Sequence, residues 1–433
     1  MPVITSIADL QALARRRVPR MFYDYADSGS YTEGTYRDNE AAFTRLKLRQ
    51  RVARDISNRS LASTIAGRPV TMPVALSPVG STGMQHPDGE IHAARAAERF
   101  GVPFCLSTMS VCSIEAVRAA TTKPFWFQLY VMRDRGFVED LIRRARDADC
   151  EALVLTLDLQ ILGQRHKDLK NGLSVPPKPT LRALADLATK PRWLYHFARS
   201  PNRTFGNIAG HAKDVTDLSS LTKWTADQFD LTLDWSSIEW IKERWDRKLI
   251  LKGVMDVEDA RIAASIGADA VIVSNHGGRQ LDGASASIDA LRDILDAVGD
   301  RIEVHVDGGI RSGQDVFKAL AVGAHAAWSG RAWVYGLGAM GERGVTKALE
   351  IIRDELDRTM ALCGETDIAH VGPHNLVGYD GPEPERHRRA VRGEAAAPKD
   401  EAAARKDGAS APEDGANARG DGTVVPERAS AAA

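Results

Sequence analysis

Residues 248–283 read KLILKGVMDVEDARIAASIGADAVIVSNHGGRQLDG. Two short apolar runs, at 248–252 and 270–274, flank a helical pattern at 257–266, and Asp256 is placed to cap that helix. Neither run alternates between apolar and polar residues, as half-exposed strands do. We therefore predict two parallel strands that are buried on both faces and joined by a helix, which is a βαβ unit.

The same rhythm recurs along most of the chain. Eight repeats favour a closed (β/α)₈ barrel, the TIM-barrel fold of the α/β class, over an open doubly wound sheet. An open sheet would more naturally carry the dinucleotide pattern GxGxxG after its first strand, and the pattern is missing there. The expected strands are residues 72–77, 103–107, 125–128, 152–158, 248–252, 270–274, 302–307 and 325–329.

The barrel domain is predicted at residues 1–379, with additions to the plain fold. Residues before Met72 form an N-terminal helical extension, and a long insertion of about residues 163–247 follows the fourth strand. Residues 380–433 consist almost entirely of Ala, Gly, Pro and charged residues. We predict a disordered low-complexity tail there, or a tail that folds on a partner.

Charge and cysteine content exclude several classes of protein. Lys and Arg number 57 and Asp and Glu 58, so the net charge of −1 does not indicate nucleic-acid binding. The four cysteines form no CxxC pair, so we expect no metal site and no disulfide framework. The N-terminus lacks a signal peptide and no run of 18 apolar residues exists, which favours a cytoplasmic protein.

The insertion contains a basic amphipathic stretch at residues 181–199, where Leu, Trp and Phe alternate with Lys and Arg. Such a stretch suits a segment lying on a membrane surface, on the inner face of the cell membrane if the protein is cytoplasmic. A helix packed over the mouth of the barrel would show the same pattern. Both interpretations stay open.

The sixth strand leads directly into His276-Gly277-Gly278-Arg279. A histidine at the carboxyl end of a barrel strand is placed for proton transfer. Arg279 offers a planar fork suited to a carboxylate.

Two glycine loops follow the last two strands, where barrels commonly bind phosphate. They are Asp307-Gly308-Gly309-Ile310-Arg311 and Gly330-Arg331. Other strand ends carry polar groups that could bind the edge of a ring-shaped ligand, with Lys252 facing a group that becomes anionic, such as a reduced flavin. These groups are Ser107, Gln128, Tyr130, Thr156, Asp158 and Lys252.

With these motifs the chain resembles the FMN-dependent L-2-hydroxy acid dehydrogenases and oxidases. The resemblance covers about residues 3–379 and depends most on SNHGGRQLDG at 274–283, with WFQLY, TLD, LKG and DGGIRSGQDV in order. Within the family it is most similar to the bacterial L-lactate dehydrogenases, through RQRV at 49–52 and LSTMSVCSIE at 106–115.

The resemblance implies oxidation of a small L-2-hydroxy acid, with L-lactate to pyruvate favoured and L-mandelate or an oxygen-using oxidase as alternatives. His276 would be the base, supported by Asp158. Tyr25, Arg165 and Arg279 would bind the substrate carboxylate, and Tyr130 the hydroxyl. FMN would contact Pro78, Val79, Gly80, Ser107, Gln128, Thr156, Lys252 and Ser274, with its phosphate at Asp307, Gly308, Gly309, Arg311, Gly330 and Arg331.

The resemblance also implies partners. Oxidases of the family tend to carry Ala where this chain has Gly80, so electrons are expected to pass to a quinone or another acceptor rather than to oxygen. A homo-oligomer, by analogy a homotetramer, is implied as well.

Residues 159–164 match neither the lactate nor the mandelate enzymes closely, which leaves the substrate side chain open. Two other classes compete: an FMN-dependent isomerase or nucleotide dehydrogenase, which would need a catalytic Cys loop or a diphosphate site, and a non-catalytic barrel scaffold. The sequence shows neither a catalytic Cys loop nor a diphosphate site, and a scaffold would have lost some of the acid–base and ring-binding residues that this chain carries in full.

Overall fold

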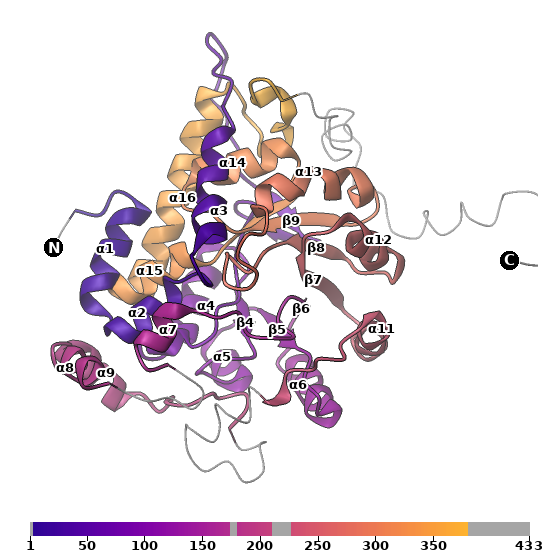
Figure 1. Cartoon of the computed structure of the whole chain (residues 1–433). Helices are drawn as coiled ribbons and strands as arrows, with labels where there is room; N and C mark the ends of the chain where they lie inside the picture. Colours follow the sequence, from indigo (N-terminus) through magenta and orange to yellow (C-terminus); the bar gives the residue numbers. More distant parts are fainter. Residues whose placement is uncertain (1–2, 174–179, 210–226, 380–433) are drawn as a thin grey trace, which may run out of the picture.

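The computed structural model describes residues 3–173, 180–209 and 227–379. Eight parallel strands surround a common axis in the order β3-β10-β9-β8-β7-β6-β5-β4, and a bridge between Leu76 and Phe104 joins the two end strands (Figure 1). The (β/α)₈ barrel is therefore confirmed. Its strands are β3 (Val74–Leu76), β4 (Cys105–Ser107), β5 (Trp126–Tyr130), β6 (Ala152–Thr156), β7 (Lys248–Val254), β8 (Ala270–Val273), β9 (Glu303–Asp307) and β10 (Ala326–Ser329).

Each strand overlaps the range predicted for it, but its first or last residue differs from the prediction. The fifth strand, β7, is longer than predicted because it continues through a bulge between Lys252 and Val254. Gly253 makes the bulge possible, since its φ is +100° and a Cβ there would lie 2.7 Å from the Asp158 carboxyl carbon. The bulge therefore brings β7 close to Asp158.

Helices cover the outside of the barrel, and apolar residues fill both layers of the core. Inside the barrel the rings of Trp126 and Trp328 lie 5.6 Å apart. Asp256 caps α12 as predicted, by accepting a hydrogen bond from the Glu258 amide. The outer helices include α4 (Gly89–Phe100), α5 (Ile114–Ala120), α6 (Arg135–Asp147), α11 (Trp235–Arg244), α12 (Val257–Ser265), α13 (Ser287–Val298), α14 (Gly313–Val322), α15 (Arg331–Met340) and α16 (Glu342–Leu362).

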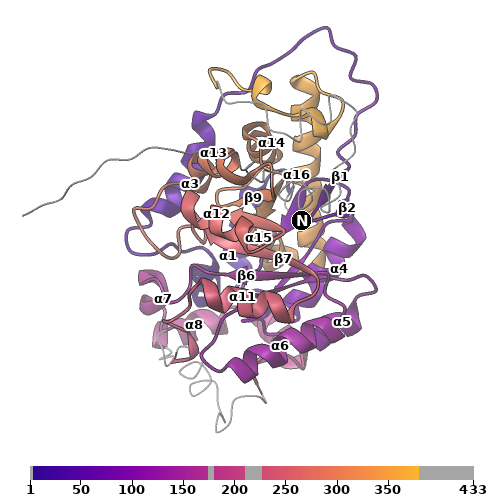
Figure 2. The same ribbon diagram turned by 90° about the vertical axis from the view of Figure 1, so that its right-hand side faces the viewer.

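The two ends of the barrel are built differently. A hairpin of β1 (Ser63–Ile65) and β2 (Arg68–Val70) lies at the end where the strands begin, and Ile65 packs into the barrel core. In Figure 2 this hairpin lies at one end, and α7 (His166–Lys170) and α8 (Leu181–Ala188) lie at the other. The strands therefore run from the hairpin toward the inserted helices.

The N-terminal extension is helical, as predicted: α1 (Ile7–Arg17), α2 (Arg20–Ala26) and α3 (Gly34–Arg45). The connection between α2 and α3 reaches the loop after β8, where the Ser30 amide donates to the Gly278 carbonyl at 2.9 Å. The extension therefore contacts the mouth of the barrel directly.

The stretch at 181–199 forms two helices, α8 and α9 (Pro191–Arg199). Trp193 of α9 is buried; it stacks on Phe22 of α2, and its indole N–H donates to the Met84 carbonyl at 3.1 Å. Leu181 and Leu184 of α8 are 86% and 52% exposed. The two helices are thus packed against the protein through Trp193, while α8 exposes apolar side chains to solvent.

Among the described residues, none of the helices is long and apolar enough to cross a membrane. The tail predicted at 380–433 lies outside the residues that the structure describes, as do parts of the insertion at 174–179 and 210–226.

Candidate active site

A cavity of about 560 Å³ opens at the carboxyl ends of the strands. It is large enough for a flavin-sized ligand. Ser107, Gln128, Thr156 and Ser274 are buried at the adjoining strand ends, and Asp158 contacts the cavity through His276. The other predicted site residues line it: Tyr25, Pro78, Val79, Gly80, Tyr130, Arg165, Lys252, His276, Arg279, Asp307, Gly308, Gly309, Arg311, Gly330 and Arg331.

His276 follows β8 in a left-handed backbone conformation, with φ of +58°. Its Nδ1 atom lies 2.8 Å from Asp158 Oδ1. Burial opposes ionisation of Asp158, but its hydrogen bond with His276 and the surrounding positive charge, that of Lys252 included, outweigh burial and hold the pKa of this carboxyl below its ordinary value. Because Asp158 is ionised, Nδ1 carries a proton and Nε2 is left as the basic nitrogen.

The pKa of His276 lies below its ordinary value of 6.5. Burial is the largest cause, and Asp158 opposes it only in part. The imidazole is therefore neutral near pH 7, as a proton acceptor must be.

A pair of buried amides holds the loop that carries His276. Asn39 of α3 donates to Asn275 Oδ1 at 2.8 Å, and Asn275 donates back to Asn39 Oδ1 at 2.9 Å. Asn275 Oδ1 also accepts from the Gly278 amide at 3.0 Å. Gly278 has φ of +74°, and a Cβ there would lie 2.4 Å from the Tyr36 amide nitrogen. Sequence reasoning missed Asn39, because no local pattern marks it.

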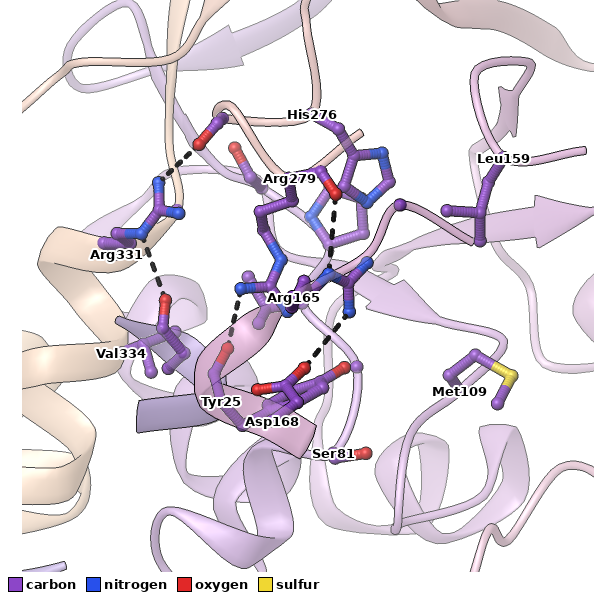
Figure 3. Close-up of a pocket in the computed structure, with 18 of the residues that line it drawn as sticks. Tyr25, Ser81, Met109, Leu159, Arg165, Asp168, His276, Arg279, Arg331 and Val334 are labelled. Carbon is purple, nitrogen blue, oxygen red and sulfur yellow. Dashed lines mark hydrogen bonds and ion pairs between the residues drawn. The ribbon is translucent and has the colours of Figure 1, made fainter. Parts of the chain in front are cut away.

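Two arginines converge beside His276 (Figure 3). The Arg279 guanidinium donates to the carbonyls of Tyr25 and Ser28 at 2.6 and 2.9 Å and lies over the Tyr25 ring, 4.9 Å from its centre. Arg165 Nε lies 3.5 Å from the Arg279 carbonyl oxygen. Burial, and then the charge of Arg165, lower the pKa of Arg279 to about 10.

The positive charge of this pair is only partly balanced. The Asp168 carboxylate lies 3.8 Å from Arg165, beyond hydrogen-bond distance. Burial raises the pKa of Asp168 above its ordinary value, although both arginines oppose that shift. Two buried guanidiniums and one distant carboxylate favour an anionic ligand. Sequence reasoning assigned no role to Asp168.

An apolar wall closes the cavity on another side. Tyr130, Leu159 and Phe229 form a buried cluster against Met109, and the rings of Tyr130 and Phe229 meet edge to face at 5.8 Å. Phe229 comes from the insertion, which carries no motif, so sequence reasoning missed it.

The strand ends beside the cavity carry a lysine and several buried polar atoms that lack a hydrogen-bond partner among the described residues. Lys252 Nζ donates to Ser274 Oγ at 2.8 Å and lies 3.1 Å from Asp307 Oδ2. The charges of Asp307 and Asp158 outweigh burial and raise the pKa of Lys252. Buried atoms without a hydrogen-bond partner in the described part of the chain include Ser77 Oγ, Gln128 Nε2, Thr156 Oγ1, Asp307 Oδ1 and Ser329 Oγ. Because such atoms are costly to leave unpaired, this set fits a polar ring such as the flavin of FMN.

The glycine loops after β9 and β10 line the same cavity. Arg331 donates to the carbonyls of Ala26, Gly277 and Ser28 at 3.0, 3.0 and 2.8 Å, which fixes its guanidinium without neutralising the charge. Arg311 pairs with Glu40 at 2.8 Å. The charge of Arg331 and the open loops fit a phosphate group.

Residues 14–378 match the family model described as FMN-dependent dehydrogenase. The chain belongs to this family. As an FMN-dependent dehydrogenase of 2-hydroxy acids it is an oxidoreductase with FMN as cofactor, which confirms the predicted fold, family and cofactor.

Relatives of this FMN-dependent dehydrogenase include the L-lactate dehydrogenase of Caulobacter vibrioides (strain NA1000 / CB15N), 47% identical over 371 residues, which are 85% of this chain and 96% of the relative. The L-lactate dehydrogenase of Haemophilus influenzae (strain PittEE) is 42% identical over 87% of this chain and 98% of its own. The solved structure of the monotopic membrane protein (S)-mandelate dehydrogenase is similar with a TM-score of 0.83 and 34% identity, over 87% of this chain and 100% of that one. A mandelate oxidase with (S)-2-phenylpropionate has a TM-score of 0.73 and 36% identity, over 87% and 98% of the two chains.

Proposed function

We propose that the protein oxidises L-lactate to pyruvate and passes the electrons to a quinone or another acceptor rather than to oxygen. The observation that carries the proposal is the placement of a neutral, Asp158-bonded His276 beside the pair Arg165 and Arg279 in one cavity. A 2-hydroxy acid needs these two elements together: a base for its proton and a cationic site for its carboxylate.

His276 takes the hydroxyl or the Cα proton of the substrate at Nε2. Asp158 then stabilises the imidazolium by its charge and by the 2.8 Å hydrogen bond. Tyr130, on the wall of the same cavity, contacts the substrate hydroxyl. The base and its partner therefore hold the proton that leaves the substrate.

Arg279 binds the carboxylate through the part of its guanidinium fork that the carbonyls of Tyr25 and Ser28 leave available. Arg165 adds a second positive charge, and the Tyr25 hydroxyl adds a donor. Binding at this end orients the Cα–H and the hydroxyl of the substrate toward His276.

Bound FMN supplies a two-electron acceptor. Its ring would be held by Pro78, Val79, Gly80 and Lys252, by Gln128 Nε2 and Thr156 Oγ1, which lack a hydrogen-bond partner within the described ranges, and by Ser107 and Ser274. Asp307–Arg311 and Gly330-Arg331 would hold its phosphate. Lys252 brings positive charge to the part of the cavity where negative charge develops on reduction.

The apolar wall of Met109, Leu159 and Phe229 supports a small substrate side chain, since these side chains are already packed against Tyr130. Relatives at 47% identity are named L-lactate dehydrogenase, in agreement with a methyl group. L-Mandelate is the second candidate, favoured by the likeness to a mandelate dehydrogenase structure and by the aromatic rings of this wall.

The exposed apolar residues of α8 support contact with a membrane surface on the cytoplasmic side, where a quinone is available. A structurally similar mandelate dehydrogenase is described as a monotopic membrane protein. A homo-oligomer remains a prediction from the family resemblance.

Anaerobic titration of the FMN-loaded protein tests the proposal. We expect L-lactate to bleach the flavin absorbance at a higher kred/Kd than L-mandelate or glycolate, and D-lactate to leave the spectrum unchanged. A higher ratio for L-mandelate would establish the second candidate instead. A flavin that none of these acids reduces would refute the function.

A further inference from the structure

The carboxyl end of α2 contacts two arginines that line the same cavity. Arg279 donates to the carbonyls of Tyr25 and Ser28, and Arg331 donates to those of Ala26 and Ser28. Both guanidiniums thus share one acceptor, the Ser28 carbonyl oxygen, at 2.9 and 2.8 Å. Figure 3 shows Arg279 near Tyr25, with Arg331 on the same side of the cavity, close to Val334.

This shared acceptor links two functions. Under the proposed function, on which this inference rests, Arg279 binds the substrate carboxylate and Arg331 the FMN phosphate. The arginines follow different strands, β8 and β10. A movement of the Ser28 peptide would displace both guanidiniums, because each bonds to the same oxygen.

Asp27 fixes the segment that contains these carbonyls. Its Oδ1 accepts from the hydroxyls of Tyr335 and Tyr36 at 2.6 and 3.0 Å, and its Oδ2 accepts from Tyr23 at 3.0 Å. The Tyr36 ring in turn packs against the Arg331 guanidinium, 4.3 Å from the ring centre. One carboxylate therefore restrains the backbone of residues 26–28 and the aromatic surface beneath Arg331.

The ionisation state of Asp27 also supports a role in holding this segment. Burial opposes ionisation of Asp27, but the three tyrosine hydrogen bonds and the charge of Arg331 outweigh it and hold the pKa of this carboxyl below its ordinary value. Asp27 is therefore an anion whose oxygens accept hydrogen bonds from the tyrosines and whose pKa responds to the charge of Arg331.

We propose that Asp27 is a positioning residue that couples the FMN phosphate site to the substrate carboxylate site through the Ser28 carbonyl. Ordering of Arg331 by a phosphate also orders Ser28 and, with it, Arg279. Binding of FMN then orders the carboxylate site, and loss of Asp27 weakens the binding of both FMN and the substrate carboxylate.

The test compares Asp27→Asn with Asp24→Asn. Asp24 is a carboxylate of α2, three residues before Asp27, and its hydrogen-bond partners are Arg20 and Asn171. FMN affinity is measured on apoprotein by quenching of flavin fluorescence. Affinity for oxalate, a carboxylate probe, is measured on FMN-saturated protein by the change in flavin absorbance, and thermal unfolding is followed in parallel.

We expect Asp27→Asn to raise both Kd values by about tenfold, within the range of measured couplings between sites. Asp24→Asn should leave both within about twofold. Arg331 bonds its three carbonyls from three different nitrogens, and the single nitrogen of a lysine cannot occupy all three places. Arg331→Lys should therefore weaken oxalate binding at saturating FMN, and adding Asp27→Asn should weaken it little further, because both changes act through Ser28.

A lower Tm for Asp27→Asn with unchanged Kd values would show a purely structural role and overturn the proposal. A weaker FMN affinity with normal oxalate affinity at saturating FMN would overturn it equally. Protein that shows the coupled loss but is not reduced by L-lactate would refute the proposed reaction and leave the coupling established. Wild-type holoprotein that does not bind oxalate would overturn the coupling, and the titration with L-lactate decides the reaction separately.

Discussion

Asn39 and Asn275 exchange two amide hydrogen bonds, of 2.8 and 2.9 Å, although they lie 236 residues apart in the chain. Asn39 belongs to the N-terminal extension and Asn275 precedes His276. The extension is thus part of the active-site framework, and the conformation of the His276 loop depends on a helix that is not part of the barrel.

Replacement of Asn39 by Leu should impair both stability and turnover. The substitution removes both hydrogen bonds that Asn39 makes to the buried Asn275 side chain, which lowers the free energy of unfolding by about 1–3 kcal/mol. Because the loop then loses its restraint, we also expect kcat to fall while FMN stays bound. Urea unfolding and steady-state rates measure the two effects. Asn202→Ala serves as control, since Asn202 lies on the insertion and its substitution removes a hydrogen bond to Asp88. Normal kcat in a destabilised Asn39→Leu enzyme would show that the loop does not need Asn39.

His276→Gln should retain FMN while turnover falls roughly 10²–10⁴-fold, the usual contribution of general acid–base catalysis. Glutamine keeps the size and polarity of the side chain but cannot accept a proton. Flavin content and the rate of anaerobic reduction are the measurements. Near-normal reduction would mean that another group is the base.

The pH dependence should follow the neutral form of His276. The pKa of His276 is below 6.5, so kcat/KM should fall on the acid side with a midpoint below 6.5 and stay level above it. Asp158→Asn removes a charge that raises this pKa, so the acid limb should move to still lower pH. The plateau should drop as well, because the imidazolium formed in the reaction is less stable. An acid limb that moves to higher pH would contradict the pairing of His276 with Asp158.

Arg279→Lys should raise KM and lower kcat/KM strongly although the charge is kept. Arg279 bonds the carbonyls of Tyr25 and Ser28 through one nitrogen and keeps the others for a carboxylate, whereas a lysine has a single ammonium and offers no planar fork. Steady-state kinetics with L-lactate and the oxalate Kd measure the change. Unchanged constants would place the carboxylate elsewhere in the cavity.

Gly80→Ala should speed the reaction of the reduced flavin with oxygen. A Cβ at Gly80 would lie 3.0 Å from Met109 Cβ and 3.5 Å from the Tyr25 hydroxyl, so the methyl group alters volume and access in the cavity. The wild type should be reoxidised slowly by oxygen and fast by a quinone or a dye. Stopped-flow mixing of substrate-reduced protein with air-saturated buffer gives both rates. A wild-type enzyme that oxygen reoxidises as fast as substrate reduces it would be an oxidase.

The sequence by itself determined the barrel and the position of its chemistry. Short, continuously apolar runs between helical patterns indicate strands buried on both faces, and eight such repeats favour a closed barrel. In that fold all strands end at one rim, so His276, Lys252, Asp158 and the two glycine loops could be assigned to one site from their place after each strand.

Only the tertiary structure decided what holds these groups in place. Arg279 and Arg331 are held by backbone carbonyls of residues 25–28, and every residue has a carbonyl, so no sequence pattern marks them. Asn39, Asp27 and Phe229 come from the extension and the insertion, whose paths over the barrel mouth depend on packing between distant segments. Local periodicity records which face of an element is buried, but it does not record which distant side chain completes a hydrogen bond there.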